Sequence, residues 1–321
     1  MYNNRFLPSF FPSRKVSENA SDKLARDRIN AILKDCGDVC DTNITGVPSL
    51  YYPMIRKRVN CTGLFLNHAL DAGRSIGRAP EIPEFMLPLF SYNGRVKVAP
   101  FKSGLLNEQY LGSTALSSIW HKNVVEKWKH NCSMRNLHGN YGDGETNNVL
   151  DGLLRMQTVR NGHVLVIGSE NPWVESCVLA AGAKLVTTLE YGNITSFHPQ
   201  IETMTPSEMV SRYRENRMPL FDAIVTFSSV EHTGLGRYGD ALNPWGDLQM
   251  MARAWCLTKP RGELLIGVMT DGGRGDRIEF NAHRVYGPLM FSHLLSNWKQ
   301  KWRAPEGAQL VHVLKKLDPM E

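Results

Sequence analysis

Hydrophobic positions between residues 163 and 190 fall into three consecutive patterns, which predict a strand, a helix and a second strand. The run His163–Ile167 is mostly apolar, rich in Val and Ile, and stops at Gly168, as is typical of a strand buried on both faces. Apolar residues then recur at helical spacing between residues 174 and 181. The run Lys184–Leu189 is again rich in β-forming residues. This order predicts a parallel strand–helix–strand unit.

The same alternation of patterns extends over the C-terminal half of the chain. Strands are predicted at 221–227, 263–269 and 309–317, and helices at 21–35, 64–72, 114–130, 145–159, 205–214, 243–257 and 289–298. Strands that alternate with helices favour an α/β fold with a mostly parallel, doubly wound sheet, and the last run suits an antiparallel edge strand. We expect a flexible arm at 1–20, an irregular or helical region at 21–140, and the α/β domain at 141–321.

The second predicted strand ends on an acid that suits a nucleoside. Glu190 lies about twenty residues beyond the Gly168 turn, where dinucleotide-binding folds place a carboxylate on a ribose. The glycine pattern of such a turn is incomplete, because Glu170 and Pro172 stand where a G-x-G-x-G turn has its second and third glycines. Glu170 would also repel an approaching anion, which disfavours a pyrophosphate cofactor such as NAD.

A polar group follows the strand predicted at 221–227. Ser228, Glu231 and His232 come directly after it. In open α/β sheets the ligand crevice lies beyond the carboxyl ends of the strands, so these residues stand where chemistry is expected. His232 is the candidate general base, because the ordinary pKa of histidine is about 6.5, and Glu231 is the candidate that orients it. The alternative, in which this pair braces the loop, stays open.

Composition narrows the class of protein only a little. The chain has 321 residues, 42% of them hydrophobic and 21% charged, which is ordinary for a globular protein. The net charge of +6 comes from the first 150 residues, and either an acidic partner or a solvated surface accounts for it. No RNA-binding motif accompanies this charge, so specific nucleic-acid binding is not expected.

The compartment is not decided by the sequence. No apolar stretch is long enough to cross a bilayer, and residues 1–15 lack the apolar core of a signal peptide, so a cytoplasmic protein is the default expectation. The cysteines and the Asn-x-Ser/Thr sequons leave a secretory-pathway lumen as the alternative. The sequons begin at Asn19, Asn43, Asn60, Asn131 and Asn193.

Six cysteines divide into two predicted groups. Cys36, Cys40, Cys61 and Cys132 are able to pair in an oxidising lumen. Cys177 and Cys256 fall on predicted helix faces and are expected to be buried thiols. A zinc site is not expected, because no second Cys or His pair follows the first two cysteines at ligand spacing.

Several segments together resemble the Rossmann-like S-adenosylmethionine-dependent methyltransferases. They are VLVIGS with the strand-end acid Glu190, FDAIVTFSSVEH, and TKPRGELLIGV, and the resemblance covers residues 141–317. More closely, GSENPWVE, LEYGNI, SSVEHTGLGRYGD, NPWGDL and NAHRVYGP resemble a domain family of unknown function on the margin of that superfamily. The resemblance implies a methyltransferase-like fold and S-adenosylmethionine as the cofactor.

The resemblance also implies roles for individual residues. Gly168 and Ser169 border the methionine end of the cofactor, and Glu190 binds its ribose. Glu170 and Ser228 are further candidates for contact with the cofactor. Tyr191 either lies at the adenine or covers the end of the sheet. Apart from the resemblance, Tyr141 lies in the turn before the helix predicted at 145–159, so it is a candidate lid residue over a cofactor pocket, with an ordinary loop tyrosine as the alternative. The residues expected to hold an acceptor are His283, Arg284 and Tyr286, with a structural role as the alternative for His283.

Two hypotheses of different kinds follow from these residues. The first is a methyltransferase that acts on a hydroxyl of a small molecule or glycan. The second is a non-catalytic methyltransferase-like fold that serves as a binding or scaffold protein, favoured by Glu170 and Pro172 in the turn. An NAD-dependent oxidoreductase is disfavoured by the same turn, and a serine hydrolase by the lack of a G-x-S-x-G motif.

Overall fold

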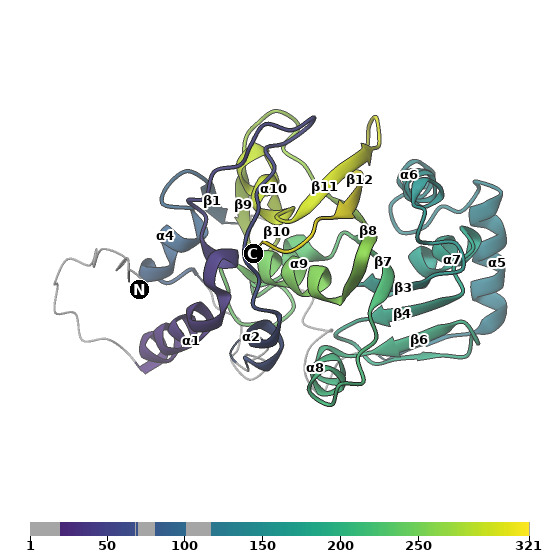
Figure 1. Cartoon of the computed structure of the whole chain (residues 1–321), viewed down its shortest axis with the longest axis horizontal. Helices are drawn as coiled ribbons and strands as arrows, with labels where there is room; N and C mark the ends of the chain where they lie inside the picture. The colour runs from purple at the N-terminus through teal and green to yellow at the C-terminus, as the bar shows by residue number, and fades with distance from the viewer. Residues whose placement is uncertain (1–19, 68, 70–80, 101–116, 321) are drawn as a thin grey trace.

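A seven-stranded sheet forms the centre of the molecule. The computed structural model describes residues 20–67, 69, 81–100 and 117–320, and the strands lie in the order β11-β12-β8-β7-β3-β4-β6 (Figure 1). Their bounds are β3 His163–Ile167, β4 Leu185–Leu189, β6 Ile201–Met204, β7 Phe221–Phe227, β8 Thr258–Met269, β11 Trp298–Arg303 and β12 Gln309–Lys316. The strands from β8 to β6 are parallel, whereas β12 is antiparallel to both of its neighbours. The expected mostly parallel sheet with an antiparallel edge is confirmed, but the last strand, β12, was expected at the edge and lies one place inside it, because β11 pairs with its outer side.

Helices cover both faces of this sheet. Their bounds are α1 Ala20–Cys36, α2 Cys61–Leu66, α4 Leu87–Phe90, α5 Lys122–Ser133, α6 Asp143–Arg155, α7 Trp173–Ala180, α8 Pro206–Arg214, α9 Gly246–Leu257 and α10 Pro288–Leu294. Helices α5, α6 and α7 lie together on one side of the sheet, and α9 and α10 lie on the other (Figure 1). The sheet is therefore doubly wound, as predicted.

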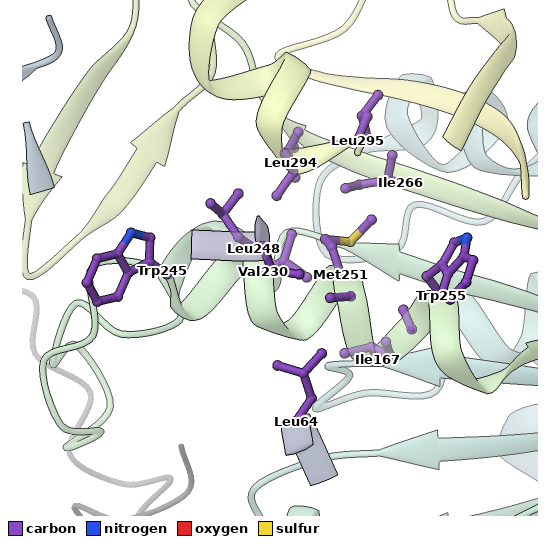
Figure 2. Packing of buried hydrophobic residues seen from close by; sticks show 14 of the residues in the cluster. Leu64, Ile167, Val230, Trp245, Leu248, Met251, Trp255, Ile266, Leu294 and Leu295 are labelled. Atoms are coloured by element: carbon purple, nitrogen blue, oxygen red, sulfur yellow. The ribbon is translucent and has the colours of Figure 1, made fainter. Parts of the chain in front are cut away.

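Side chains of β3 alternate between the two cores. Val164 and Val166 join the core under α5, α6 and α7, whereas Leu165 and Ile167 join the core under α9. Figure 2 shows Ile167 near Met251 of α9 in this second core. Both faces of β3 are thus apolar because both are covered, which explains the nearly continuous hydrophobic run in the sequence.

The N-terminal region packs on the face that carries α9. Ile32 of α1 and Leu64 of α2 are fully buried members of the same core as Leu248 and Met251. Figure 2 shows Leu64 beside these residues of α9. Two small sheets complete the fold, and they consist of β1 Lys97–Pro100 with β9 Arg277–Phe280 and β10 His283–Val285, and of β2 Ser118–Trp120 with β5 Ile194–Ser196. The predicted arm at 1–20 lies, apart from Ala20, outside the described residues.

Most predicted elements are confirmed. The helix predicted at 64–72 runs instead from Cys61 to Leu66, and residues 68 and 70–72 of the predicted range lie outside the described residues. Two further exceptions are edge structures. Residues 118–120 were expected in a helix, but they form β2, which pairs with β5, and α5 begins only at Lys122. Trp298 was expected at the end of a helix, but α10 ends at Leu294 and Trp298 begins β11. In both places an aromatic residue that suits an amphipathic helix is equally well buried in a strand.

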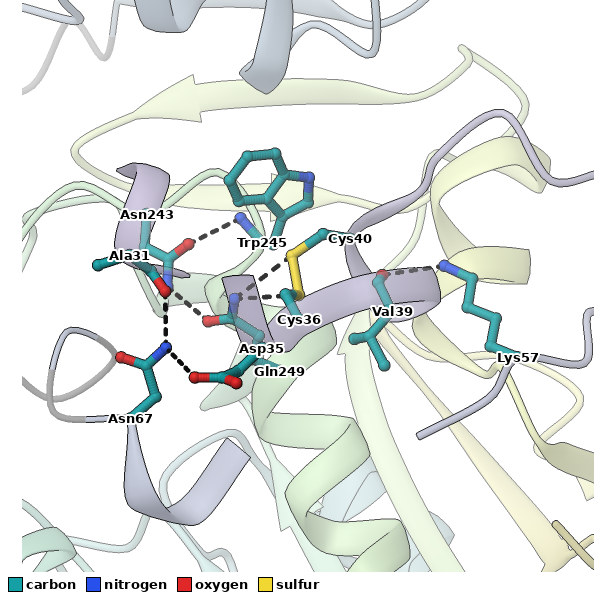
Figure 3. The surroundings of a disulfide bond; sticks show 10 residues. All are labelled: Ala31, Asp35, Cys36, Val39, Cys40, Lys57, Asn67, Asn243, Trp245 and Gln249. Carbon is teal, nitrogen blue, oxygen red and sulfur yellow. Dashed lines mark hydrogen bonds between the residues drawn. A yellow bond between two sulfur atoms is a disulfide. The ribbon is translucent and has the colours of Figure 1, made fainter. Parts of the chain in front are cut away.

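All six cysteines are paired. The disulfides join Cys36 to Cys40, Cys61 to Cys256, and Cys132 to Cys177. The expectation that Cys177 and Cys256 are plain buried thiols is therefore wrong, because each meets a cysteine that is distant in sequence. Gln249 donates a hydrogen bond to each sulfur of the Cys36–Cys40 bridge, at 3.3 and 3.4 Å (Figure 3). No helix among the described residues is long and apolar enough to cross a membrane.

Candidate functional site

A cavity of about 140 Å³ opens at the carboxyl ends of β3, β4 and β7. Its lining includes residues from all three strand ends and from the loop after β7. These residues are Asn140, Tyr141, Ile167, Gly168, Ser169, Glu170, Trp173, Leu189, Glu190, Tyr191, Pro206, Phe227, Ser228, Ser229, His232, Thr233, Tyr238, Asp240 and Met250. The cavity lies where an open α/β sheet is expected to bind its ligand.

Gly168 allows two strand ends to approach each other closely. Its φ is +75°, a conformation that side chains rarely adopt, and its N–H donates to the carbonyl of Leu189. A Cβ atom at this position would lie 2.0 Å from Oγ and 2.4 Å from Cβ of Ser229. Glycine is therefore required here by the backbone and by the contact with the loop after β7.

Glu190 faces the same cavity as Gly168. Its Oε2 accepts the N–H of Ser169 at 2.8 Å, and its Oε1 accepts the N–H of Tyr191 at 2.6 Å. Burial raises the pKa of Glu190, while these main-chain donors oppose the rise. A carboxylate offers about four lone-pair sites, so each oxygen is still able to accept a hydroxyl. The predicted pairing of glycine turn and strand-end acid around one hollow is present.

A second acid, Glu175 of α7, lies beneath the turn and was missed by the sequence reasoning. Its side chain is fully buried, and its two oxygens accept Ser169 Oγ at 2.9 Å and Thr188 Oγ1 at 2.8 Å. Burial raises the pKa of Glu175 to about 7. Glu175 thus fastens the turn after β3 to the end of β4. The available signal was one charged residue within the apolar helix WVESCVLA.

Glu170 is exposed at the rim of the cavity. Its carbonyl accepts the indole N–H of Trp120 at 3.2 Å, and its charge contributes to the raised pKa of Glu190. Pro172 stands directly before α7, which begins at Trp173. The residues that replace the two missing glycines therefore shape the entrance to the cavity and the start of the helix.

His232 is held in one tautomer. It lies in the short 3₁₀ turn η4 (Val230–His232), and its Nδ1 is 2.6 Å from the carbonyl oxygen of Ala282. Because a carbonyl oxygen only accepts, Nδ1 carries the proton of the neutral ring, and Nε2 carries the lone pair. Burial, with Arg237 nearby, lowers the pKa of His232 to about 3. The ring is thus neutral at physiological pH and able to accept a hydrogen bond.

Glu231 is fully buried beside this ring. Its Oε1 lies 4.0 Å from His232 Nε2, and neither carboxyl oxygen makes a well-formed hydrogen bond to the residues that the structure describes. Burial raises the pKa of Glu231 to about 7. Glu231 does not line the cavity, so it is placed to act on His232 and not on a ligand directly.

Arg284 and Tyr286 were expected to hold an acceptor, but they brace the fold. Both side chains are fully buried, and neither lines the cavity. Arg284 donates to the carbonyl of Thr233 at 2.6 Å and lies 3.4 Å from Asp247, whose Oδ2 also accepts the hydroxyl of Tyr286 at 2.9 Å. This buried group fixes the loop after β7 against α9. His283 also stands outside the cavity, with its Nε2 3.5 Å from Glu279 Oε2.

The loop after β7 supplies further cavity residues. Ser228 lines the cavity as predicted, and its Oγ accepts Gln309 Nε2 at 2.8 Å. Tyr141, the candidate lid residue, lines the cavity with its ring centroid 5.2 Å from that of Phe227. Tyr238 and Asp240 were not predicted, because nothing in the pattern TGLGRYGDALNP marks which side chains turn inward.

The cavity is acidic. Glu170, Glu190 and Asp240 contribute carboxyl groups to its lining, whereas the described residues that line it include no lysine or arginine. Ile167, Leu189, Phe227 and other apolar side chains form part of the wall. Such a surface favours a ligand that carries positive charge together with an apolar ring, and it disfavours a pyrophosphate.

The sheet order and the position of the cavity define a Rossmann-like, methyltransferase-like fold. Residues 161–304 match the family model described as "Caenorhabditis protein of unknown function, DUF268". This match includes β3, β4 and β7 with the turn and loop that surround the cavity. It confirms the predicted resemblance to a domain family of unknown function. A comparison with curated proteins found no match.

Solved structures with some similarity include three bacterial enzymes. The 1,6-didemethyltoxoflavin-N1-methyltransferase of Burkholderia thailandensis is 17% identical, with a TM-score of 0.37 over 59% of this chain and 90% of that one. The N-methyltransferase NodS of Bradyrhizobium japonicum is 13% identical, with a TM-score of 0.37 over 57% and 100%. The ribosomal protein L11 methylase of Lactobacillus delbrueckii is 11% identical, with a TM-score of 0.36 over 54% and 78%.

Proposed function

We propose that the protein is an S-adenosylmethionine-dependent methyltransferase that acts on a hydroxyl of a small molecule or glycan. The observation that carries this proposal is the cavity framed by Gly168 and Glu190, with carboxyl groups and no lysine or arginine among the described residues of its lining. S-adenosylmethionine carries a cationic sulfonium and an ammonium group, which an acidic cavity attracts. NAD carries a pyrophosphate, for which this lining offers no cation.

The residues of the cavity fit this cofactor. Glu190 accepts the ribose hydroxyls, and Gly168 with Ser169 borders the methionine end. Tyr191 lies next to Glu190 and covers the side of the adenine. Glu170 and Asp240 add negative charge near the cationic groups. When bound, the cofactor supplies an electrophilic methyl group on sulfur.

His232 activates the acceptor. Its Nε2 lone pair accepts the hydrogen bond of an acceptor hydroxyl, because Nδ1 is committed to the carbonyl of Ala282. A ring with a pKa of about 3 is a weak base, so it needs a partner for the proton. Glu231, with a pKa of about 7 and an oxygen 4.0 Å from Nε2, is that partner.

Two observations favour the second candidate, a non-catalytic binding protein. Both oxygens of Glu190 already accept main-chain N–H groups, and Glu170 stands at the rim where a carboxylate of the cofactor would enter. A methyltransferase-like protein that no longer binds the cofactor would keep the hydrogen bonds of Glu190 because they stabilise the ends of β3 and β4. This candidate predicts an intact fold without affinity for the cofactor.

Titration calorimetry with S-adenosylhomocysteine separates the two candidates. The enzyme proposal predicts binding by the wild-type protein and a loss of about tenfold or more for Glu190→Gln, because hydrogen bonds to a charged group contribute roughly 1.5–3 kcal/mol. Glu202→Gln is the matched control, since Glu202 is exposed on β6 and does not line the cavity. No heat from the wild-type protein at millimolar ligand removes the enzyme proposal.

Turnover is tested with methyl-labelled cofactor and a panel of hydroxyl-bearing small molecules and glycans. We expect transfer by the wild-type protein and a loss of about 10²–10⁴-fold for His232→Asn, with unchanged affinity for S-adenosylhomocysteine. If His232→Asn transfers the methyl group as fast as the wild-type protein, His232 only stabilises the loop after β7 and takes no part in the reaction.

A further inference from the structure

Two of the three disulfides connect parts of the chain that are far apart in sequence. Cys61 of α2 and Cys256 of α9 are 195 residues apart, and their Cα atoms are 5.8 Å from each other. Cys132 of α5 and Cys177 of α7 are 45 residues apart, with Cα atoms at 5.5 Å. Both distances lie in the range that a disulfide requires. These bridges tie the N-terminal region to the sheet and two helices of the opposite face to each other.

No cysteine is left over. All six lie within the described residues, and each has one partner. In a compartment that keeps thiols reduced, buried cysteines have no reason to meet in pairs. Three separate pairs, two of them between distant segments, therefore indicate that the chain folds in an oxidising environment.

Two of the sequons are well placed for modification in such an environment. In Asn43-Ile44-Thr45 the asparagine and the threonine are exposed, and the same holds for Asn193-Ile194-Thr195. Neither segment contains a cysteine. Asn193 follows Glu190 by three residues, on the side of β4 that borders a smaller hollow of about 110 Å³. A substituent on either Asn side chain would extend into solvent.

Two other sequons are poorly placed. The side chain of Asn60 caps α2 by accepting the N–H of Gly63 at 2.9 Å, and its Nδ2 lies against Gly63. Asn131 is half-buried on α5. In both sequons the middle residue, Cys61 or Cys132, is part of a disulfide. The sequon at Asn19 lies outside the described residues.

We propose that the protein matures in an oxidising compartment of the secretory pathway and carries N-linked glycans on Asn43 and Asn193. Each disulfide forms from two thiols, which lose two protons and pass two electrons to an oxidised dithiol protein of that compartment. At each asparagine, Nδ2 loses a proton and forms a bond to the anomeric carbon of an oligosaccharide. The bond between that carbon and the diphosphate of a lipid-linked donor breaks. This proposal does not depend on the methyltransferase activity.

The test directs the full chain into the secretory pathway of a eukaryotic cell and maps the product. Alkylation without reduction, followed by mass spectrometry, is expected to label none of the six cysteines. Removal of N-glycans with peptide N-glycosidase converts each modified Asn to Asp, and we expect this conversion at residues 43 and 193. Asn43→Gln and Asn193→Gln should each remove one glycan, whereas Asn136→Gln, an exposed asparagine outside any sequon, should remove none.

Several results would overturn the proposal. Six alkylated cysteines in a folded product would remove the disulfides, and a product without sugar at both asparagines would remove the glycans. Conversion at Asn60 or Asn131 in place of Asn43 and Asn193 would contradict the selection of sites. If the chain is retained in the cell, the retained pool is mapped in the same way. The disulfides are tested separately with the chain made in a reducing cytosol. If that product is folded and its unfolding midpoint is the same before and after oxidation of the thiols, the disulfides are contradicted.

Discussion

Replacement of Gly168 by alanine tests the close approach between the β3 turn and the loop after β7. The new Cβ would lie 2.0 Å from Ser229 Oγ and 2.4 Å from Ser229 Cβ. Rotation of the serine side chain moves Oγ but leaves its Cβ in place, so the backbone must shift. Overpacking of this kind costs roughly 1–3 kcal/mol. The φ of +75° adds about 1–2 kcal/mol for a residue with a side chain.

The expected loss of stability for Gly168→Ala is therefore about 2–5 kcal/mol. It is measured by denaturant unfolding under non-reducing conditions, as a shift of the midpoint at unchanged slope. Gly94→Ala is the matched control, because Gly94 has a φ of +82° and nothing within 4 Å of its would-be Cβ. This control should cost only the backbone component, about 1–2 kcal/mol.

The double variant Gly168→Ala with Ser229→Gly isolates the contact. Removal of the serine side chain should recover about 1–3 kcal/mol as a coupling energy, while the strain at residue 168 remains. If Gly168→Ala costs no more than Gly94→Ala, or if the coupling energy is within about 0.5 kcal/mol of zero, the two strand ends do not meet as described, and the geometry of the cavity is wrong.

Three further predictions concern buried groups. Glu175→Gln should change the pH dependence of stability, because the native state holds the Glu175 proton to about pH 7 and the unfolded chain releases it near 4.5. As pH rises between these values, the wild-type protein should lose up to about 3 kcal/mol of unfolding free energy relative to the variant. Equal pH profiles of the two proteins would contradict this. Replacement of both Cys61 and Cys256 by serine should lower the unfolding free energy by up to about 5 kcal/mol, because their bridge closes a long loop. Replacement of both Cys36 and Cys40 should lower it by at most about 2 kcal/mol. Unfolding midpoints that rank the two variants the other way would contradict these disulfide pairings. Arg284→Ala should destabilise by roughly 3–5 kcal/mol because Asp247 is left buried without its partner, and a stable variant with weaker acceptor binding would restore Arg284 to the site.

The central strands could be predicted because burial on both faces leaves a local signal. In β3, both alternating faces are apolar, and Gly168 marks the end of the run. By contrast, β6 and β11 lie at the two edges of the sheet. β6 is only four residues long with Glu202 exposed, and β11 reads WKQKWR, so neither carries an apolar run. An edge strand forms because it pairs with a neighbouring strand, and the hydrophobic pattern of its own residues does not show that pairing.

The site shows the same division between local and distant determinants. Gly168 and Glu190 could be predicted because each directly follows a strand, and His232 because it lies in the loop just after β7; strand ends meet at one edge of the sheet. The burial of Glu175 depends on the helices and strands packed around α7, and the inward direction of Arg284 depends on the path of a loop fifty residues earlier. Disulfide partners 195 residues apart are likewise set by the whole fold.

The most direct test of the central claim is a diffraction map from crystals of the protein soaked in S-adenosylhomocysteine. The account predicts density for the ligand in the cavity at the ends of β3, β4 and β7, with ribose hydroxyls on the Glu190 carboxylate and the chain of the ligand passing Gly168. Ligand density elsewhere, or a cavity without ligand density at saturating ligand, would contradict the account.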